Sequence, residues 1–254
     1  MPVFSKHLSQ DFWPEEMSYL NCEALQQVNQ IVAQELTPYL SHIPQKQWPE
    51  MTWLEENFWA LLVLIPAGNA PESISCGGVV QLVYFAQQIH NLIPEEGGTE
   101  CYRYPILVGD YLFAKAFQLL LRSHLEHWLP AIAQVAENAN EARAAILQEE
   151  KSGTLTLEKK ALLVEREYGE LAALAVKMGA EAAKLSLPQH DAIAEAAYGL
   201  GVLHGMIKEK AIFQWAKRRE VTLSLIAALP EPCRGGMEEL CQKVLQQYSN
   251  IADH

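Results

Sequence analysis

The chain has 254 residues and a formal net charge of −12; half of its residues are hydrophobic and a fifth are charged. This composition is typical of a globular protein with a substantial core and excludes a disordered chain. The basic residues are unevenly distributed, because residues 1–102 contain only Lys6 and Lys46 against twelve acidic residues. Without a basic stripe to displace counterions from phosphates, we expect no nucleic-acid partner.

The cysteines are odd in number, widely spaced and without a C-x-x-C pair: Cys22, Cys76, Cys101, Cys233 and Cys241. This pattern predicts neither a disulfide framework nor a structural zinc site, and it favours a reducing cytoplasm. Residues 1–20 contain no continuous apolar core. The longest apolar run, residues 58–67, falls short of the ~20 residues that span a bilayer. We therefore expect a cytoplasmic protein without a transmembrane segment.

Apolar residues recur at three- and four-residue steps through most of the chain, which predicts helices. The predicted helices cover residues 79–93, 106–129, 162–185, 192–216 and 236–248. The helix over 106–129 is expected to bury an apolar face that includes Ile106, Leu107 and Leu121. No stretch alternates with period two, so strands should be few or absent. The breaks between the periodic segments are short, so we expect residues 1–254 to form a single all-α domain of roughly eight to ten helices, one or two of them buried at the centre.

Few residues suggest chemistry by themselves. His124 and His127 could place two ligands on one metal ion, but a third ligand is missing, so surface histidines are the favoured interpretation. His90 and His204 lie in apolar surroundings, which is typical of hydrogen-bonded core histidines. The charged runs 208–210 and 217–220 are interpreted as solvated helix faces. No glycine loop is followed by Lys-Ser/Thr, and no serine or cysteine is marked as a nucleophile by its neighbours. Residue chemistry alone therefore indicates no active site.

One segment adds further information. Residues 104–117, YPILVGDYLFAKAF, closely resemble the Gly-Asp-Tyr-Leu helix of the trans-isoprenyl (polyprenyl) diphosphate synthases. Residues 80–95, VQLVYFAQQIHNLIPE, are then similar to the helix that ends in the family's first aspartate-rich motif. Residues 165–171 with Gly179-Ala180 resemble its Lys-Thr-Ala segment and Gly-Ala pair, and residues 198–209 resemble the helix before the second aspartate-rich motif. The resemblance covers about residues 79–215 and implies an isoprenoid-synthase-like helical bundle around a central cavity.

Synthases of this family hold magnesium ions with two Asp-Asp-x-x-Asp motifs, and these ions bind an allylic diphosphate and promote its departure as a leaving group. The first motif's aspartate positions correspond here to Asn91, Leu92 and Glu95, which follow the matching His90. Those of the second motif correspond to Lys208, Glu209 and Ile212. The lysine and threonine of the middle motif correspond to Glu167 and Tyr168. A leucine cannot bind magnesium and a lysine repels it. The resemblance therefore implies degenerate motifs, with no metal ion, no cofactor and no catalytic residue.

The basic residues that hold isopentenyl diphosphate in this family are also missing. Residues 50–70 contain no Lys or Arg, and neither do residues 96–101. The whole chain contains only four aspartates, which is too few for two aspartate-rich motifs. The resemblance thus implies that neither diphosphate site is retained.

This pattern predicts a non-catalytic partner subunit of a polyprenyl diphosphate synthase, acting in the synthesis of isoprenoids such as quinone side chains. Some bacterial long-chain synthases are heterodimers of a catalytic subunit and a smaller, motif-poor subunit. The residues that correspond to the subunit-packing helix are Gly109, Asp110, Tyr111, Phe113 and Phe117, so the expected partner is a motif-complete synthase subunit in a heterodimer, or a second copy in a homodimer.

Three further expectations accompany this prediction. Ala86 and Gln87 occupy positions that control product length in the family, so the chain could shape a tunnel for an isoprenoid chain. Lys208 is expected to pair with a glutamate such as Glu95 where a metal ion would otherwise lie. Two alternative functions stay open. The first is an active prenyltransferase that makes polyprenyl diphosphates and binds magnesium with atypical glutamate ligands such as Glu95 and Glu209. The second is an isoprenoid-binding protein without catalysis.

Overall fold

The computed structural model describes residues 22–40, 51–68, 70–92 and 99–252. The helices in chain order are α2 (Cys22–Leu40), α3 (Trp53–Ala67), α4 (Pro71–His90), α5 (Thr99–Arg122), α6 (Leu129–Ser152), α7 (Leu157–Val164), α8 (Glu170–Ala182), α9 (Leu187–Lys208), α10 (Trp215–Ala227) and α11 (Cys233–Ala252). A short 3-10 helix, Glu126–Trp128, precedes α6, and a π-helical segment, Glu165–Gly169, joins α7 to α8. No strand occurs in these ranges, so the all-α prediction is confirmed.

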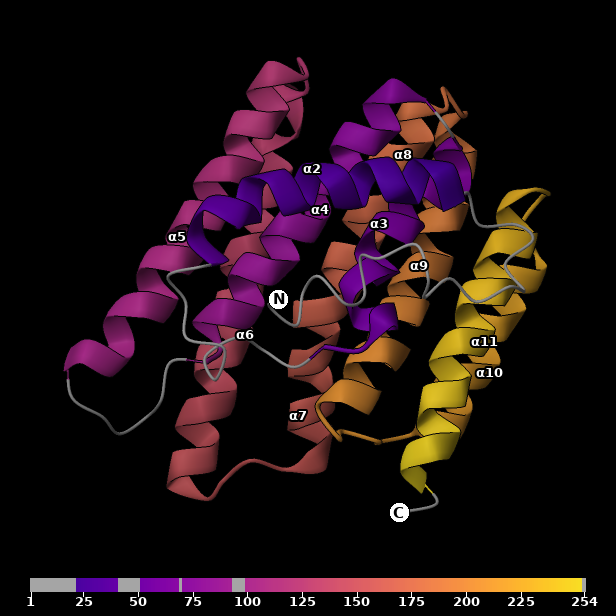
Figure 1. Cartoon of the computed structure of the whole chain (residues 1–254). Coiled ribbons are helices and arrows are strands. Elements are labelled where there is room, and N and C mark those ends of the chain that lie inside the picture. The colour runs from indigo at the N-terminus through magenta and orange to yellow at the C-terminus, as the bar shows by residue number, and fades with distance from the viewer. Residues whose placement is uncertain (1–21, 41–50, 69, 93–98, 253–254) are drawn as a thin grey trace.

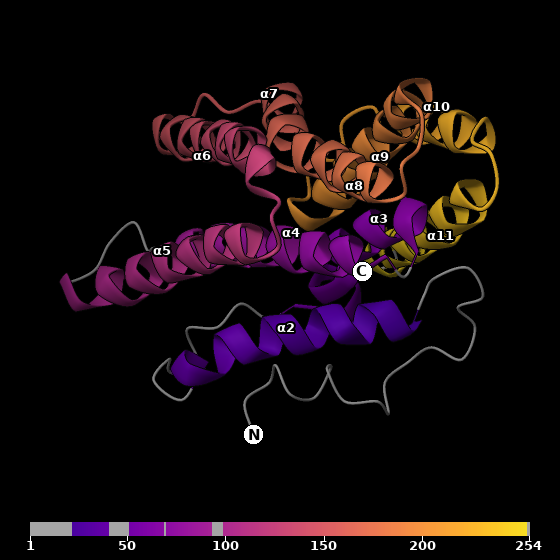
Figure 2. The same ribbon diagram turned by 90° about the horizontal axis from the view of Figure 1, so that it is seen from above.

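The helices are arranged in layers (Figures 1 and 2). Seen from above, α2 forms one layer, α3, α4 and α5 form the next, and α6 to α9 form a third on the opposite side. The helices α10 and α11 pack at the side where α3 and α9 lie. One hydrophobic cluster contains side chains from every helix in the described ranges, which places the core between these layers.

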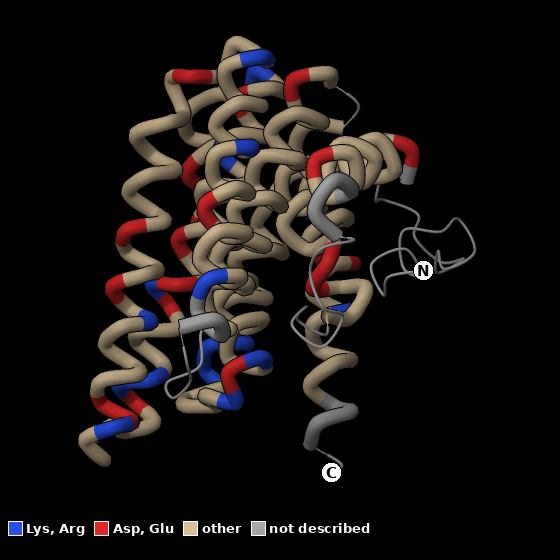
Figure 3. Tube along the Cα trace, turned by 60° about the vertical axis from the view of Figure 1, so that its left-hand side comes forward, with Lys and Arg blue, Asp and Glu red and all other residues tan. Residues whose placement is uncertain are grey.

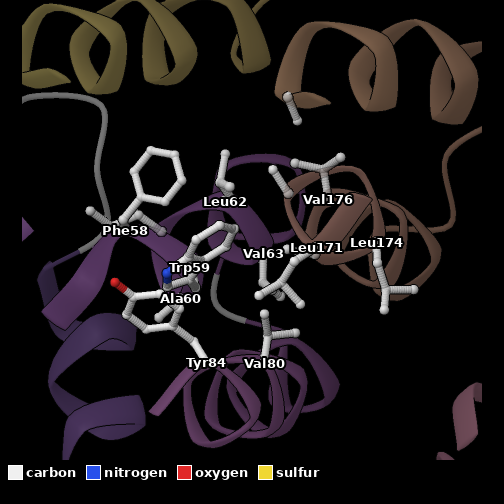
Figure 4. Packing of buried hydrophobic residues seen from close by; sticks show 14 of the residues in the cluster. Phe58, Trp59, Ala60, Leu62, Val63, Val80, Tyr84, Leu171, Leu174 and Val176 are labelled. Carbon is white, nitrogen blue, oxygen red and sulfur yellow. The ribbon is translucent and has the colours of Figure 1, made fainter. Parts of the chain in front are cut away.

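Helix α3 is the buried centre of this arrangement. Thr52 caps its N-terminus: its hydroxyl accepts a hydrogen bond from the backbone N–H of Glu55, and the Glu55 carboxylate accepts one from the backbone N–H of Thr52. From Phe58 to Val63 every side chain is fully buried. Figure 4 shows α3 side chains packed between Tyr84 and Val80 of α4 and Leu171 of α8. The expectation of a buried central helix is confirmed.

Charged residues are correspondingly rare in the middle of the bundle. In Figure 3 the inner helices are almost entirely free of Lys, Arg, Asp and Glu, and the charged positions lie on outer helices and toward helix ends. The buried cysteines Cys76, Cys233 and Cys241 are free thiols. None of the helices in the described ranges combines the length and hydropathy that a membrane span requires.

The predicted helix boundaries were wrong in several places. The first predicted helix begins earlier, at Pro71, because a proline at the first helical position needs no hydrogen-bond partner for its nitrogen. The helix predicted over 106–129 ends at Arg122, followed by His124 in a left-handed conformation. The helix predicted over 192–216 ends at Lys208, and the left-handed Gln214 precedes α10. Periodicity alone continues through such breaks, because the apolar pattern resumes on the next helix.

The apolar face predicted for residues 106–129 was also partly wrong. Ile106, Leu107 and Leu121 are 42%, 67% and 55% exposed, respectively. Helix α5 lies at the edge of its layer, where one side packs on α4 and the opposite side is not covered by another helix of the described ranges.

One buried acidic group makes the stability of the fold pH-dependent. Glu56 of α3 is only 4% exposed, and one of its carboxylate oxygens has no hydrogen-bond partner. Burial, together with the neighbouring Glu55, raises its pKa from 4.5 to about 8. The unfolded chain releases this proton at a lower pH than the folded chain. The contribution of protonated Glu56 to the free energy of unfolding is therefore complete below pH 4.5 and is lost as the pH rises toward 8.

We therefore expect Glu56→Gln to remove this loss. Between pH 5 and pH 8 the free energy of unfolding of the wild type should fall relative to that of the variant by about 2–4 kcal/mol, on the basis of the linkage between pKa and stability. Urea unfolding at both pH values measures the difference, with the exposed Glu238→Gln as the control. A wild-type-to-variant difference that is the same at both pH values contradicts the prediction.

Candidate functional site

The residues at the matched motif positions meet at one end of the bundle. Asn91 directly follows α4, and Lys208 and Glu209 are at the end of α9. Glu167 and Tyr168 lie in the π-helical segment Glu165–Gly169. The first turn of α3, which carries Glu55, lies at this same end because Glu55 contacts Lys208. Segments separated by more than a hundred residues thus place five polar side chains from three motif regions in one cluster.

The centre of this cluster is Arg143 of α6. Its guanidinium binds Glu209 through two hydrogen bonds, Nη2 to Oε1 at 2.9 Å and Nη1 to Oε2 at 3.1 Å. The same Nη2 atom lies 3.1 Å from Oε1 of Glu167. Asn91 adds a hydrogen bond from Nδ2 to that Glu167 oxygen at 3.3 Å. The guanidinium therefore joins α6 and the end of α9 to the π-helical segment, and Asn91 joins the end of α4 to the same Glu167 oxygen.

The π-helical segment positions Glu167 and Tyr168 for these contacts. π-Helical turns are rare and are frequently found at functional sites, where the extra residue changes the direction of the side chains. The Tyr168 ring lies against Gly205 of α9, where a Cβ atom would be only 2.5 Å from Cγ of the ring. Gly205 thus permits the close approach of Tyr168, whose hydroxyl donates a 2.7 Å hydrogen bond to Oε1 of Glu209.

Lys208 forms a second ion pair beside the first. Its Nζ atom lies 2.9 Å from Oε1 of Glu55 and donates a 2.8 Å hydrogen bond to the hydroxyl of Tyr84. The capping interaction with Thr52 holds Glu55 in place, and Tyr84 is fully buried in α4. The interpretation of residues 208–210 as a solvated face was wrong for its first two members, since the side chains of Lys208 and Glu209 are 18% and 13% exposed.

The expected pairing of Lys208 with a glutamate is thus made with Glu55. Glu95, which the sequence suggested, lies outside the described residues. Leu92 and Ile212 are both described and are 37% and 38% exposed. These two apolar residues occupy matched motif positions and contribute no donor atom.

The carboxyl groups respond differently to this environment. Burial opposes ionisation of Glu209, but the hydrogen bonds and charge of Arg143 outweigh it and lower the pKa of Glu209. Burial likewise opposes ionisation of Glu55, and the charge of Lys208 with the Thr52 hydrogen bond outweighs it and lowers the pKa of Glu55. For Glu167 burial is stronger than the attraction of Arg143, and it raises the pKa to about 7. Two carboxylates are therefore firmly ionised and matched by two cations.

A magnesium ion does not fit this set of donors. Magnesium requires hard oxygen ligands in octahedral geometry and is usually bound by one or two carboxylates with several waters. The ionised carboxylates in the described cluster already neutralise Arg143 and Lys208. No group of three or more His, Cys, Asp or Glu side chains in the described ranges is arranged to hold a metal ion. An added divalent cation would have to displace a buried protein cation.

The matched residues of α5 and the end of α4 contact each other. The His90 ring lies directly on Gly109, where any side chain would collide with it. Nε2 of His90 is 3.4 Å from Oδ1 of Asp110, whose side chain is largely exposed. The Tyr111 hydroxyl donates a 3.2 Å hydrogen bond to the carbonyl of Glu35 in α2. Phe113 and Phe117 are partly buried against the core.

The other histidines and the two product-length positions are also described. His204 is buried, but neither ring nitrogen has a hydrogen-bond partner among the described residues, so the expectation of a hydrogen-bonded core histidine was wrong. Its ring stacks on Phe58, and burial lowers its pKa to about 4. His124 is exposed and His127 pairs with Glu181 at 2.6 Å, which confirms both as surface histidines. Ala86 and Gln87 are buried in α4.

Three residues of the cluster were not predicted from the sequence: Arg143, Glu55 and Tyr84. A signal for Arg143 was present, because buried residues of α6 recur at 132, 135, 139, 142 and 146, and position 143 lies on the same side of the helix. For Glu55 the capping sequence Thr52-x-x-Glu55 predicted a helix start but not a second partner. In the sequence Tyr84 has the pattern of an ordinary core aromatic residue. Only the tertiary structure shows that its hydroxyl accepts a hydrogen bond from Lys208.

No protein-family model and no curated protein sequence matches this chain. Solved structures do match. The decaprenyl diphosphate synthase of Rhodobacter capsulatus is 14% identical, with a TM-score of 0.68 over 89% of this chain and 96% of that chain. The polyprenyl synthase of Caulobacter crescentus CB15, solved with calcium and isoprenyl diphosphate, is 17% identical, with a TM-score of 0.68 over 88% of this chain and 95% of that one. A deletion mutant of the heterotetrameric geranyl pyrophosphate synthase of mint is 16% identical, with a TM-score of 0.62 over 95% of this chain and 99% of that one.

The fold is therefore that of the trans-prenyl diphosphate synthases, and the predicted isoprenoid-synthase-like helical bundle is confirmed. Identities this low establish the fold and leave the activity to be argued from the site.

The stability contributed by Arg143 can be measured against a matched arginine. Removing one partner of a buried ion pair leaves an uncompensated buried charge and typically costs about 3–5 kcal/mol, whereas exposed pairs contribute about 0–1 kcal/mol. Arg143→Ala should therefore destabilise the protein far more than Arg166→Ala, because the side chain of Arg166 and that of its partner Glu141 are 43% and 59% exposed. Urea unfolding at neutral pH tests this, and equal losses in the two variants contradict it.

Proposed function

We propose that the chain is a non-catalytic partner subunit of a polyprenyl diphosphate synthase, and that it forms a heterodimer with a motif-complete subunit in isoprenoid biosynthesis. One observation carries this proposal: the carboxylates at the matched motif positions are paired with protein cations. Glu209 binds Arg143, and Lys208, at a matched aspartate position, binds Glu55. A residue that should attract magnesium thus carries a positive charge of its own.

The chemistry of prenyl transfer explains why this arrangement does not support catalysis. A diphosphate leaving group develops negative charge that metal ions or basic side chains must neutralise. Arg143 and Lys208 are the cations of the described cluster, and both are already neutralised by glutamates. Glu167, at the position of the middle-motif lysine, would repel a diphosphate when ionised.

The outer side of α5 supports the choice of a protein partner. Tyr104, Leu107, Ala114 and Leu121, here called the α5 stripe, follow one another at steps of three and seven residues, which places them on one side of the helix. All four are exposed, and Leu107 is 67% exposed. An exposed apolar surface with this regularity is typical of a protein interface. The structural similarity to mint geranyl pyrophosphate synthase, which is heterotetrameric, is consistent with such a role.

The alternatives have weaker support. An active prenyltransferase with glutamate ligands would need Glu209 released from Arg143, because that carboxylate is bound through both of its oxygens. An isoprenoid-binding protein would need an apolar cavity. A pocket of about 320 Å³ does lie at the other end of α4, lined by residues that include Cys76, Trp128 and Met178. Glu72, Glu181 and Lys184 also line it, which suits an apolar chain poorly.

Co-expression with a motif-complete prenyl synthase from the same source tests the partner role. We expect the two chains to co-purify as one complex, and we expect the complex to make a product of different length from the synthase alone, assayed with farnesyl and isopentenyl diphosphates. Absence of a complex together with unchanged product length overturns the proposal. Magnesium-dependent turnover by the purified chain alone would instead favour the active-enzyme alternative.

The α5 stripe provides a matched pair of variants for the same experiment. Leu107→Glu should weaken the complex by about 2 kcal/mol or more, roughly a thirtyfold loss of affinity, because a charge would enter the core of the interface. Leu187→Glu changes a leucine that is 77% exposed on α9, away from the stripe, and should leave the complex intact. Equal binding by both variants, measured by surface plasmon resonance, would place the interface elsewhere.

A further inference from the structure

The cluster at the ends of α4 and α9 contains its own cations. The side chain of Arg143 is 18% exposed and lies between Glu167 and Glu209, which are 4% and 13% exposed. Both carboxylates direct an Oε1 atom at the same Nη2 atom of Arg143, at 3.1 and 2.9 Å. Two carboxylates from different segments therefore converge on a single positively charged group.

This convergence resembles the way in which carboxylates surround a bound ion. Each of the two protein cations joins segments that are distant in the chain: Arg143 joins α6 to the π-helical segment and α9, and Lys208 joins α9 to α3 and α4. Carboxylates held together without a cation would repel each other strongly at this burial. The two side-chain cations therefore make the approach of these glutamates possible.

One carboxylate oxygen of the cluster is not satisfied by these contacts. Oε2 of Glu167 is buried and has no hydrogen-bond partner among the residues that the structure describes. A buried polar atom without a partner is destabilising, and it is tolerated when the residue contributes elsewhere to a strong interaction. Without the guanidinium of Arg143, three carboxylate oxygens would lose their shared cation: Oε1 of Glu167 and both oxygens of Glu209.

We propose that Arg143 and Lys208 are the resident cations of this site. They pair with the carboxylates that would otherwise hold a divalent cation, so the native chain binds no Mg²⁺ there. A neutral residue in place of Arg143 creates a divalent-cation site formed by Glu167 and Glu209. Mg²⁺ and Mn²⁺ are the ions to test, because both prefer oxygen ligands such as carboxylates and water. The inference shares the non-catalytic part of the proposed function and is independent of the partner role.

Binding of Mn²⁺, followed by electron paramagnetic resonance of the free ion with Mg²⁺ as competitor, tests the proposal on the full chain. We expect no site-specific Mn²⁺ binding in the wild type or in Arg166→Gln, which removes an exposed arginine. Arg143→Gln should bind one Mn²⁺ at least about tenfold more tightly than the wild type, equivalent to about 1.4 kcal/mol. The double variant Arg143→Gln with Glu209→Gln should lose that binding.

Two results overturn the proposal. One is a wild-type Mn²⁺ site that Glu209→Gln abolishes, since the native carboxylates would then accept a metal ion beside Arg143. The other is an Arg143→Gln variant that binds Mn²⁺ no more tightly than the wild type. If Arg143→Gln does not fold without metal, circular dichroism with added Mn²⁺ decides: refolding supports the proposal, and a chain that stays unfolded at saturating Mn²⁺ refutes it. The partner role is unaffected by either result, because complex formation through α5 is measured separately.

Discussion

The buried guanidinium of Arg143 is the interaction on which the organisation of the site depends. It lies between Glu167 and Glu209, and Glu167 in turn accepts a hydrogen bond from Asn91 at the end of α4. Burying carboxylates is unfavourable unless an opposite charge with good hydrogen-bond geometry accompanies them. The two-bond contact with Glu209 supplies that geometry. Without the guanidinium, the ends of α9 and the π-helical segment would present unpaired negative charge to each other.

The rest of the bundle places these groups. The capping of α3 by Thr52 fixes Glu55, the missing side chain at Gly205 admits Tyr168, and the π-helical segment directs Glu167 toward α6. The same fold in the R. capsulatus and C. crescentus synthases belongs to enzymes that act on diphosphates. In this chain the matched end of the bundle carries internal ion pairs. The core that defines the fold and the charged cluster at its end consist of different residues, so a shared fold does not determine the chemistry of the site.

Prediction from the sequence was most successful where local patterns decide the outcome. Three- and four-residue periodicity predicted an all-α protein with one or two helices buried at the centre, and the structure shows α3 in that position. Helix ends were less predictable, because the breaks after Arg122 and Lys208 depend on left-handed residues such as His124 and Gln214 that have no glycine to mark them. The exposed side of α5 was misjudged for a related reason: periodicity shows that a face is apolar but not whether this chain or another covers it.

The sequence by itself determined the fold class, the positions that match the motifs and the identity of the residues at those positions, since each of these depends on residue type and spacing alone. Only the tertiary structure decided which charges meet. Lys208 could have faced solvent, and Arg143 belongs to a helix of average polarity that drew no attention. Lys208 pairs with Glu55, 153 residues away in the chain, and Arg143 pairs with Glu209, 66 residues away. Such distant pairings follow from how the helices pack. A charge becomes part of a site when packing removes it from water beside an opposite charge, and no local pattern contains that information.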